Sequence, residues 1–142
     1  MLVFTVLLSA CAPAASSTES PTVTVSGNAC TYSGPNQIPS QATFTFDVQD
    51  SGNDVNYNFL GVALSESQTV DDLRTLTNLP RTYQDIPEEI DHLFYWDVSA
   101  GSQKTKQIDF GANAAFNGKP IYIVCGNDLT NIGVVGPLEV KD

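Results

Sequence analysis

Residues 41–49 read QATFTFDVQ, and this stretch decides how the rest of the chain is interpreted. Its apolar side chains occupy every second position, at Ala42, Phe44, Phe46 and Val48, and polar residues fill the positions between them. Successive side chains of a β-strand point to opposite faces of a sheet, so this period of two indicates a half-buried strand. The stretch therefore predicts a sheet with one face in a hydrophobic core.

The segments on both sides of this stretch also have the character of strands and turns. Upstream, Thr22–Ser26 has the same alternation. Downstream, residues 50–54 (DSGND) are turn-forming, and Val55–Leu64 is the expected return strand. The apolar positions of the return strand change phase near Gly61, which predicts a β-bulge there.

One short helix is expected after the return strand. Thr69 is followed three residues later by Asp72, the spacing of a capping box, and Asp residues in a first turn suit the positive end of a helix dipole. Val70, Leu73 and Leu76 would form the buried side of this helix, which Pro80 would close.

The rest of the chain continues the pattern of short strands separated by turns. We expect strands at Leu93–Val98, Gln103–Phe110, Pro120–Cys125 and Leu138–Lys141, with loops at residues 111–119 and 126–136. Many short strands with one helix predict an all-β fold, a two-sheet Greek-key sandwich in a single domain.

Composition and charge limit the possible partners of such a domain. Of the 142 residues, 42% are hydrophobic and only 15% are charged, which suits a packed core with a mostly uncharged polar surface. The 16 acidic and 6 basic residues give a net charge of -10. Binding to nucleic acid requires clustered Lys and Arg side chains, so we expect no nucleic-acid partner.

The N-terminus indicates export and a lipid anchor. Residues 1–10 (MLVFTVLLSA) are long enough for the apolar core of a signal peptide but too short to span a bilayer. Leu8-Ser9-Ala10-Cys11 resembles the lipobox of bacterial and archaeal lipoproteins, in which the Cys receives the lipid. Because no basic residue precedes Cys11, the true start is expected upstream. Residues 11–21 would be the lipidated Cys and its tether, and residues 22–142 the sandwich domain.

Two further cysteines lie within the domain, Cys30 and Cys125. Two cysteines in an exported domain most often pair, so we expect a disulfide. The alternatives are two free thiols, or one thiol used as a metal ligand.

The C-terminal stretch IYIVCGNDLTNIGVVGPLEVKD resembles the end of a cupredoxin, where a strand with a Tyr runs into a copper-binding Cys. The stretch QIPSQATFTFDVQDSGNDVNYNF resembles the strand, turn and strand that carry the first copper ligand. The resemblance implies ligands at Cys125 and near Tyr57, and at the positions of Asp128 and Val134. Of these residues only Cys125 is of a type that binds copper in blue-copper sites, which also need two His ligands. The chain has one His, so the sequence excludes a blue-copper site. No cofactor is expected.

The whole chain also resembles small prokaryotic lipoproteins. In these a Cys-x-Tyr-x-Gly-Pro segment begins the domain, here at Cys30–Pro35, and a Cys followed by a Gly-Pro strand ends it, here at Cys125 and Gly136–Val140. The helix segment Gln68–Leu73 fits the same group. The resemblance implies a lipid-anchored sandwich of cupredoxin-like or immunoglobulin-like topology and carries no activity with it.

A few side chains remain as candidates for a site. His92, beside Glu88, Glu89 and Asp91, could be a general base or metal ligand, but a surface His is the simpler interpretation, because zinc sites need three or four protein ligands. Four residues around the 50–54 turn could bind calcium: Asp47, Asp50, Asn53 and Asp54. They lack the EF-hand pattern, and turn chemistry without a metal is the simpler interpretation.

The aromatic run Phe94-Tyr95-Trp96 could contact a ligand. Because neighbouring residues of a strand point to opposite faces, we expect Trp96 to pack with Phe94 and Val98 and Tyr95 to be the exposed one. Tyr95, Trp96 and His92 are the candidate ligand contacts.

Together these observations predict a non-catalytic binding or accessory module of the cell envelope, anchored on the extracytoplasmic side of a membrane by Cys11. Its partner would be an envelope protein or a surface ligand. Two alternatives stay open: a redox or metal-handling protein that uses Cys125, and a structural subunit of a surface or envelope complex.

Overall fold

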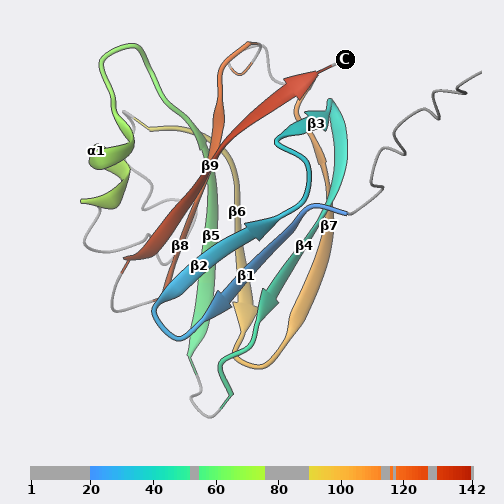
Figure 1. Ribbon diagram of the computed structural model, residues 1–142, viewed down its shortest axis with the longest axis vertical. Coiled ribbons are helices and arrows are strands. Elements are labelled where there is room, and N and C mark those ends of the chain that lie inside the picture. Colours follow the sequence, from blue (N-terminus) through green and yellow to red (C-terminus); the bar gives the residue numbers. More distant parts are fainter. Residues whose placement is uncertain are drawn as a thin grey trace, which may run out of the picture.

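A computed structural model describes residues 20–51, 55–75, 90–112, 116, 118–127 and 131–141 (Figure 1). Within these residues most of the chain is strand, which confirms the all-β prediction. The strands are β1 (Thr22–Ser26), β2 (Ala29–Ser33), β3 (Gln37–Pro39), β4 (Gln41–Val48), β5 (Asn56–Ala63), β6 (Asp91–Ser99), β7 (Gln103–Asp109), β8 (Ile121–Asn127) and β9 (Asn131–Lys141). One helix, α1 (Val70–Arg74), lies between β5 and β6.

The strands form two sheets, as predicted. One sheet has the order β2-β1-β4-β7 and the other the order β3-β9-β8-β5-β6. Most neighbours are antiparallel, but β1 pairs with β4, and β3 with β9, in parallel. An immunoglobulin domain is built from two antiparallel sheets. The two parallel pairs found here depart from that arrangement.

The main core lies between the two sheets and is centred on the stretch at residues 41–48. Ala42, Phe44, Phe46 and Val48 are all at most 4% exposed, which confirms the alternation predicted for them. The ring of Phe46 lies 4.9 Å from that of Phe59, between centroids, in a tilted arrangement. Such aromatic pairs join the two sheets across the core.

A second apolar cluster covers the outer face of the five-stranded sheet. It contains Leu60 and Val62 of β5, Tyr122 and Val124 of β8, and Leu73 of α1. The interior strand β5 is therefore buried on both faces, with Phe59 in the main core and Leu60 in the outer cluster.

Because β5 is buried on both faces, the change of apolar phase near Gly61 does not come from a bulge in β5 itself. The register between β5 and β6 does shift between Gly61 and Val62, at the predicted place. The extra residue is Leu93 of β6, however, because Gly61 pairs with Phe94 and Val62 pairs with His92. Strand β5 keeps its alternation and pairs with β8 without a shift. The change of apolar phase in the sequence of β5 arises because both faces of the strand are apolar.

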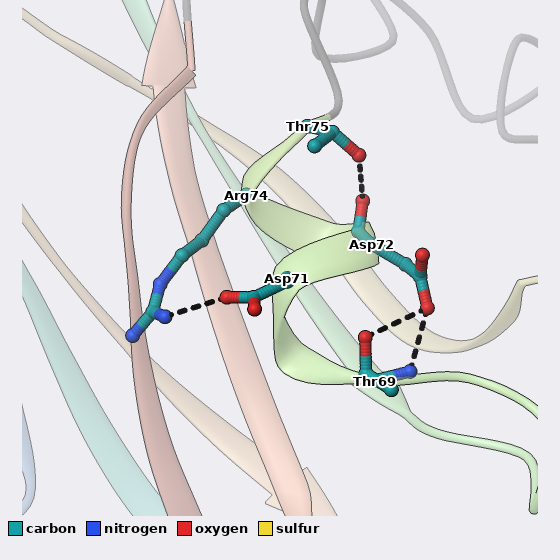
Figure 2. Close-up of polar contacts among 5 residues, drawn as sticks. All are labelled: Thr69, Asp71, Asp72, Arg74 and Thr75. Atoms are coloured by element: carbon teal, nitrogen blue, oxygen red, sulfur yellow. Dashed lines mark hydrogen bonds and ion pairs between the residues drawn. The ribbon is translucent and has the colours of Figure 1, made fainter.

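Helix α1 begins where the capping pattern predicts. The carboxylate of Asp72 accepts hydrogen bonds from the backbone N–H and the hydroxyl of Thr69, at 2.7 and 2.9 Å (Figure 2). Asp71 pairs with Arg74 on the exposed side. Leu73 is 2% exposed and Val70 packs partly against the same cluster, whereas Leu76 and Pro80 lie outside the described residues.

The C-terminal region differs from the prediction. Residues 126–136 were expected to be a loop, but β8 extends to Asn127 and β9 begins at Asn131. The glycines that suggest a loop are sites of close packing: a Cβ on Gly133 would lie 3.2 Å from the Cβ of Cys30, and one on Gly136 would lie 2.7 Å from the backbone oxygen of Ile121. Two short strands, β2 and β3, were also not predicted.

Candidate functional site

Several connections meet at one end of the sandwich, the lower end in Figure 1. This loop end, as we call it, comprises residues 27–28 between β1 and β2, 49–51 after β4, 100–102 between β6 and β7, and Asn127 at the end of β8. Backbone hydrogen bonds hold it together: Gln49 N–H donates to Val25 O and Val48 N–H to Ser102 O, both at 2.9 Å.

Asp50 is the residue that links these connections. Its Oδ1 accepts a hydrogen bond from the backbone N–H of Gly27 at 2.6 Å. Its Oδ2 accepts one from the hydroxyl of Tyr57 at 3.0 Å. Hydrogen bonds to a charged acceptor are stronger than neutral ones, so both donors fix the carboxylate in place.

Tyr57 comes to this position on β5, where it pairs with Asn127 of β8. Its side chain is buried, and burial raises the pKa of its phenol above the ordinary value of 10.0, with the hydrogen bond to Asp50 and the charge of Asp50 acting in the same direction. Tyr57 therefore remains a hydrogen-bond donor at neutral pH.

A pocket of about 420 Å³ opens beside Asp50. Its described lining consists of Gly27, Asn28, Asp50, Ser51, Tyr57 and Asn127. The side chains are amides, hydroxyls and one carboxylate, which can both donate and accept hydrogen bonds. Sequence analysis named Asp50 and Tyr57 for other reasons and missed the rest, because Asn28, Ser51 and Asn127 look like ordinary turn residues.

The predicted disulfide is present between Cys30 of β2 and Cys125 of β8. The two strands belong to different sheets, so the bond joins the two layers of the sandwich. Cys125 is fully buried, and the strand residue opposite it, Gly133, leaves room for Cys30.

The copper site implied by the cupredoxin resemblance does not fit these residues. The sulfur of Cys125 is bonded to Cys30, and the Tyr57 hydroxyl is bonded to Asp50. Val134 packs against the outer cluster, and Asp128 lies outside the described residues. The single His, His92, is on β6 opposite Val62, on the face turned away from Cys125.

The three candidate ligand contacts do not come together. Trp96 packs in the main core as expected, with its ring stacked on Phe94 at 4.4 Å and edge-on to Phe46 at 5.3 Å, between centroids. Tyr95 was expected to be exposed, but it is half-buried against the outer cluster on the opposite face of β6. The outer cluster on this face of the sheet includes Leu73 of α1. His92 is half-buried, with Nδ1 3.3 Å from the backbone oxygen of Ile90.

The other candidates are only partly within the described residues. Asp47 accepts a hydrogen bond from Gln49, Asp50 is held as above, and Asn53 and Asp54 lie outside. Among the described residues no three His, Cys, Asp or Glu side chains are grouped as metal ligands would be. Residues 1–19, with Cys11, and residues 76–89, with Glu88 and Glu89, also lie outside the described residues. The described helix is too short to cross a membrane.

Comparisons with known proteins add one similarity. No protein-family model matches the chain, and no curated protein matches it. A solved structure of the azurin Az-iso2 from the obligate methylotroph Methylomonas sp. strain J is similar, with 15% sequence identity and a TM-score of 0.49. The match covers 85% of this chain and 96% of that one.

Proposed function

We propose that this protein is a non-catalytic binding module of the cell envelope that faces the extracytoplasmic side, is anchored through Cys11 and binds its ligand at the loop end. The observation that carries the proposal is the polar pocket of about 420 Å³ around Asp50. The disulfide supports an extracytoplasmic location, because such bonds persist in oxidising compartments and are rare in the cytosol.

The direction of β1 supports the choice of this end. The chain enters the domain at Thr22, directly after the predicted tether, and β1 then leads to Ser26 and the turn at Gly27. At about 3.3 Å per residue, five strand residues separate the entry point from the pocket by roughly 16 Å. A lipid anchor on Cys11 would thus leave the loop end free to meet a ligand.

The chemistry of the pocket favours an uncharged ligand with several hydroxyl groups, such as a sugar. Its described lining has a carboxylate and no cation, which disfavours an anion, and it is mainly polar, which disfavours an apolar ligand. Both oxygens of Asp50, the one carboxylate of the described lining, already accept a hydrogen bond, and one carboxylate alone is a poor metal site. Each oxygen retains a lone pair for a ligand hydroxyl.

Site-specific photo-crosslinking on intact cells tests the binding function. A photoreactive residue in place of Ser51 or Asn28 should give defined adducts, whereas one at the exposed Gln41 or Thr105, away from the loop end, should not. Equal adducts from all four positions, or none from the loop end, would contradict the proposal. The same cells carrying Cys11→Ser should release the protein from the membrane fraction.

Titration with maltose, followed by amide NMR shifts, tests the ligand class separately. We expect shifts at Asn28, Ser51 and Asn127 that Asp50→Ala abolishes, and none with glucuronate. If Ser51 gives crosslinks but maltose causes no shifts, the binding function stands and the neutral sugar is rejected as its ligand. NMR shifts with calcium and none with maltose would indicate a metal site in place of a sugar site.

A further inference from the structure

Two sheet edges lie along one side of the sandwich. Within the described strands, β7 is the last strand of the four-stranded sheet and β6 is the last strand of the five-stranded sheet. The short turn at residues 100–102 joins them, so that they form the two margins of one open side (Figure 1). An unpaired edge strand offers its backbone groups to a strand of another molecule.

Strand β7 places two lysines toward the core along this open side. Lys104 is opposite Phe46 and Lys106 is opposite Phe44 in the pairing with β4, and both phenylalanines are fully buried. Farther along the same face of β7, Ile108 is buried. The two lysines are half-buried, whereas Gln103, Thr105 and Gln107 on the other face are exposed.

Both lysine side chains reach across to β6. The Lys104 Nζ donates a hydrogen bond to the backbone oxygen of Asp97 at 2.9 Å. The Lys106 Nζ lies 5.9 Å from the centroid of the Trp96 ring, in a cation–π contact. The ion pairs found among the described residues use Arg74 and Lys119, so neither of these two ammonium groups has a carboxylate partner there.

Such an arrangement is unfavourable for pairing with another strand. The aliphatic part of each lysine covers core side chains while its ammonium group stays in contact with water. A strand added to β7 would cover the open side and remove that water from two charges that no carboxylate of the described residues neutralises, which is costly. Inward-pointing charges on edge strands are one of the ways in which sheet proteins avoid edge-to-edge association.

We propose that Lys104 and Lys106 prevent association through the β6–β7 side, so that β7 does not pair with β7 of a second copy of this chain. The inference is independent of the binding site at the loop end. It identifies β7 as the surface through which two copies associate once the charges are removed.

Sedimentation velocity over a dilution series tests whether the two lysines prevent association, with the full chain in a Cys11→Ser background and a mild non-ionic detergent. We expect the wild-type protein to keep one mass at all concentrations. Lys104→Val combined with Lys106→Val should at least double the mass as concentration rises, and should slow amide hydrogen exchange in β7. A variant with Thr at both positions, which removes the charges with less added hydrophobicity, should associate in the same way.

Two matched controls separate the effect of these two lysines from a general effect of charge. Lys119→Val with Lys141→Val removes the same charge elsewhere and should stay at one mass. Lys104→Glu with Lys106→Glu keeps inward charges at the edge and should also stay at one mass. Folded Val and Thr variants that remain at one mass would overturn the proposal, as would association of the Glu variant. Slow exchange, in the wild-type protein, of the β7 amides that point away from β4 would overturn it too.

Discussion

The ring of Phe94 lies against the backbone of Gly61 on the neighbouring strand, in the space that a side chain at residue 61 would occupy. The two residues are paired across β5 and β6, next to the register shift that accommodates Leu93. A Cβ added to Gly61 would overlap the Phe94 ring. The ring is in turn stacked on Trp96 at 4.4 Å and edge-on to Phe46 at 5.8 Å, between centroids, so it has little room to move.

Gly61→Ala is therefore expected to destabilise the fold. Overpacking a core costs about 1 to 3 kcal/mol, and we expect the upper part of this range because aromatic neighbours hold Phe94 in place. Urea denaturation measures the free energy of unfolding. Gly111→Ala is the control, because its Cβ would meet no atom closer than 3.4 Å and it should change stability little.

A double variant tests whether Phe94 causes the cost. Phe94→Leu alone should destabilise, since it removes core contacts, but Gly61→Ala added to it should cost clearly less than in the wild-type protein. Equal costs of Gly61→Ala in both backgrounds would mean that Phe94 is not the obstacle.

The disulfide gives a second prediction about stability. Cys30 and Cys125 are 95 residues apart, and the chain-entropy model assigns about 4 to 5 kcal/mol to closing a loop of that length. Cys30→Ser with Cys125→Ala should lower the melting temperature, and reductant should do the same to the wild-type protein only. Cys11→Ser should leave the melting temperature unchanged. Equal melting curves with and without reductant would contradict a stabilising disulfide.

Local patterns were sufficient to predict the elements with a single buried face. The alternation of residues 41–48 predicts strand β4, and the Thr69–Asp72 spacing predicts the start of helix α1. Both patterns depend only on residues that are close together in the sequence. The pairing of Cys30 with Cys125 was also predicted, although it joins distant strands, because the domain has no other cysteine.

The features that depend on packing between distant segments were not predictable. Gly133 and Gly136 suggest a loop in the sequence, and only the positions of Cys30 and Ile121 explain glycines in a strand. The pocket depends on Asn28 and Asn127, from two other connections, meeting Asp50 and its neighbour Ser51. Nothing within any one of those connections indicates the others.

The cap of α1 predicts a response to acid. The hydrogen bond from the backbone N–H of Thr69, followed by that from its hydroxyl, lowers the pKa of Asp72 below the ordinary value of 3.8. A lowered pKa means that the carboxylate supports the folded state above its unfolded pKa and loses this effect as pH falls through the folded value. Helix α1 should therefore fray in acid, as carboxyl NMR shifts of Asp72 would report.

Variants of Thr69 distinguish the two donors. Thr69→Ala should raise the pKa of Asp72 only in part, since the backbone N–H remains, and Thr69→Ser should leave it unchanged. An Asp72 that titrates at its ordinary value in the wild-type protein would show that this cap does not form in solution.

The contact between Tyr57 and Asp50 predicts a response to alkali. Burial and the nearby carboxylate both raise the pKa of Tyr57 above 10.0, so the folded protein holds this proton at pH values where the unfolded chain has lost it. The stabilising effect is complete below pH 10.0 and is lost as pH rises through the folded pKa. The free energy of unfolding should thus fall from pH 9 to pH 11, and less steeply in Tyr57→Phe.

Asp50→Asn isolates the contribution of the carboxylate. This variant removes the charge but keeps an oxygen that can accept the hydrogen bond, so the pKa of Tyr57 should decrease and still exceed 10.0, because burial is the largest cause of the shift. NMR titration with tyrosine labelled at Cζ follows Tyr57 directly. The pKa of Tyr32, which burial alone raises, should stay the same and serves as the internal reference. An unchanged Tyr57 titration in Asp50→Asn would mean that the two side chains are not in contact, and the arrangement proposed for the loop end would then be wrong.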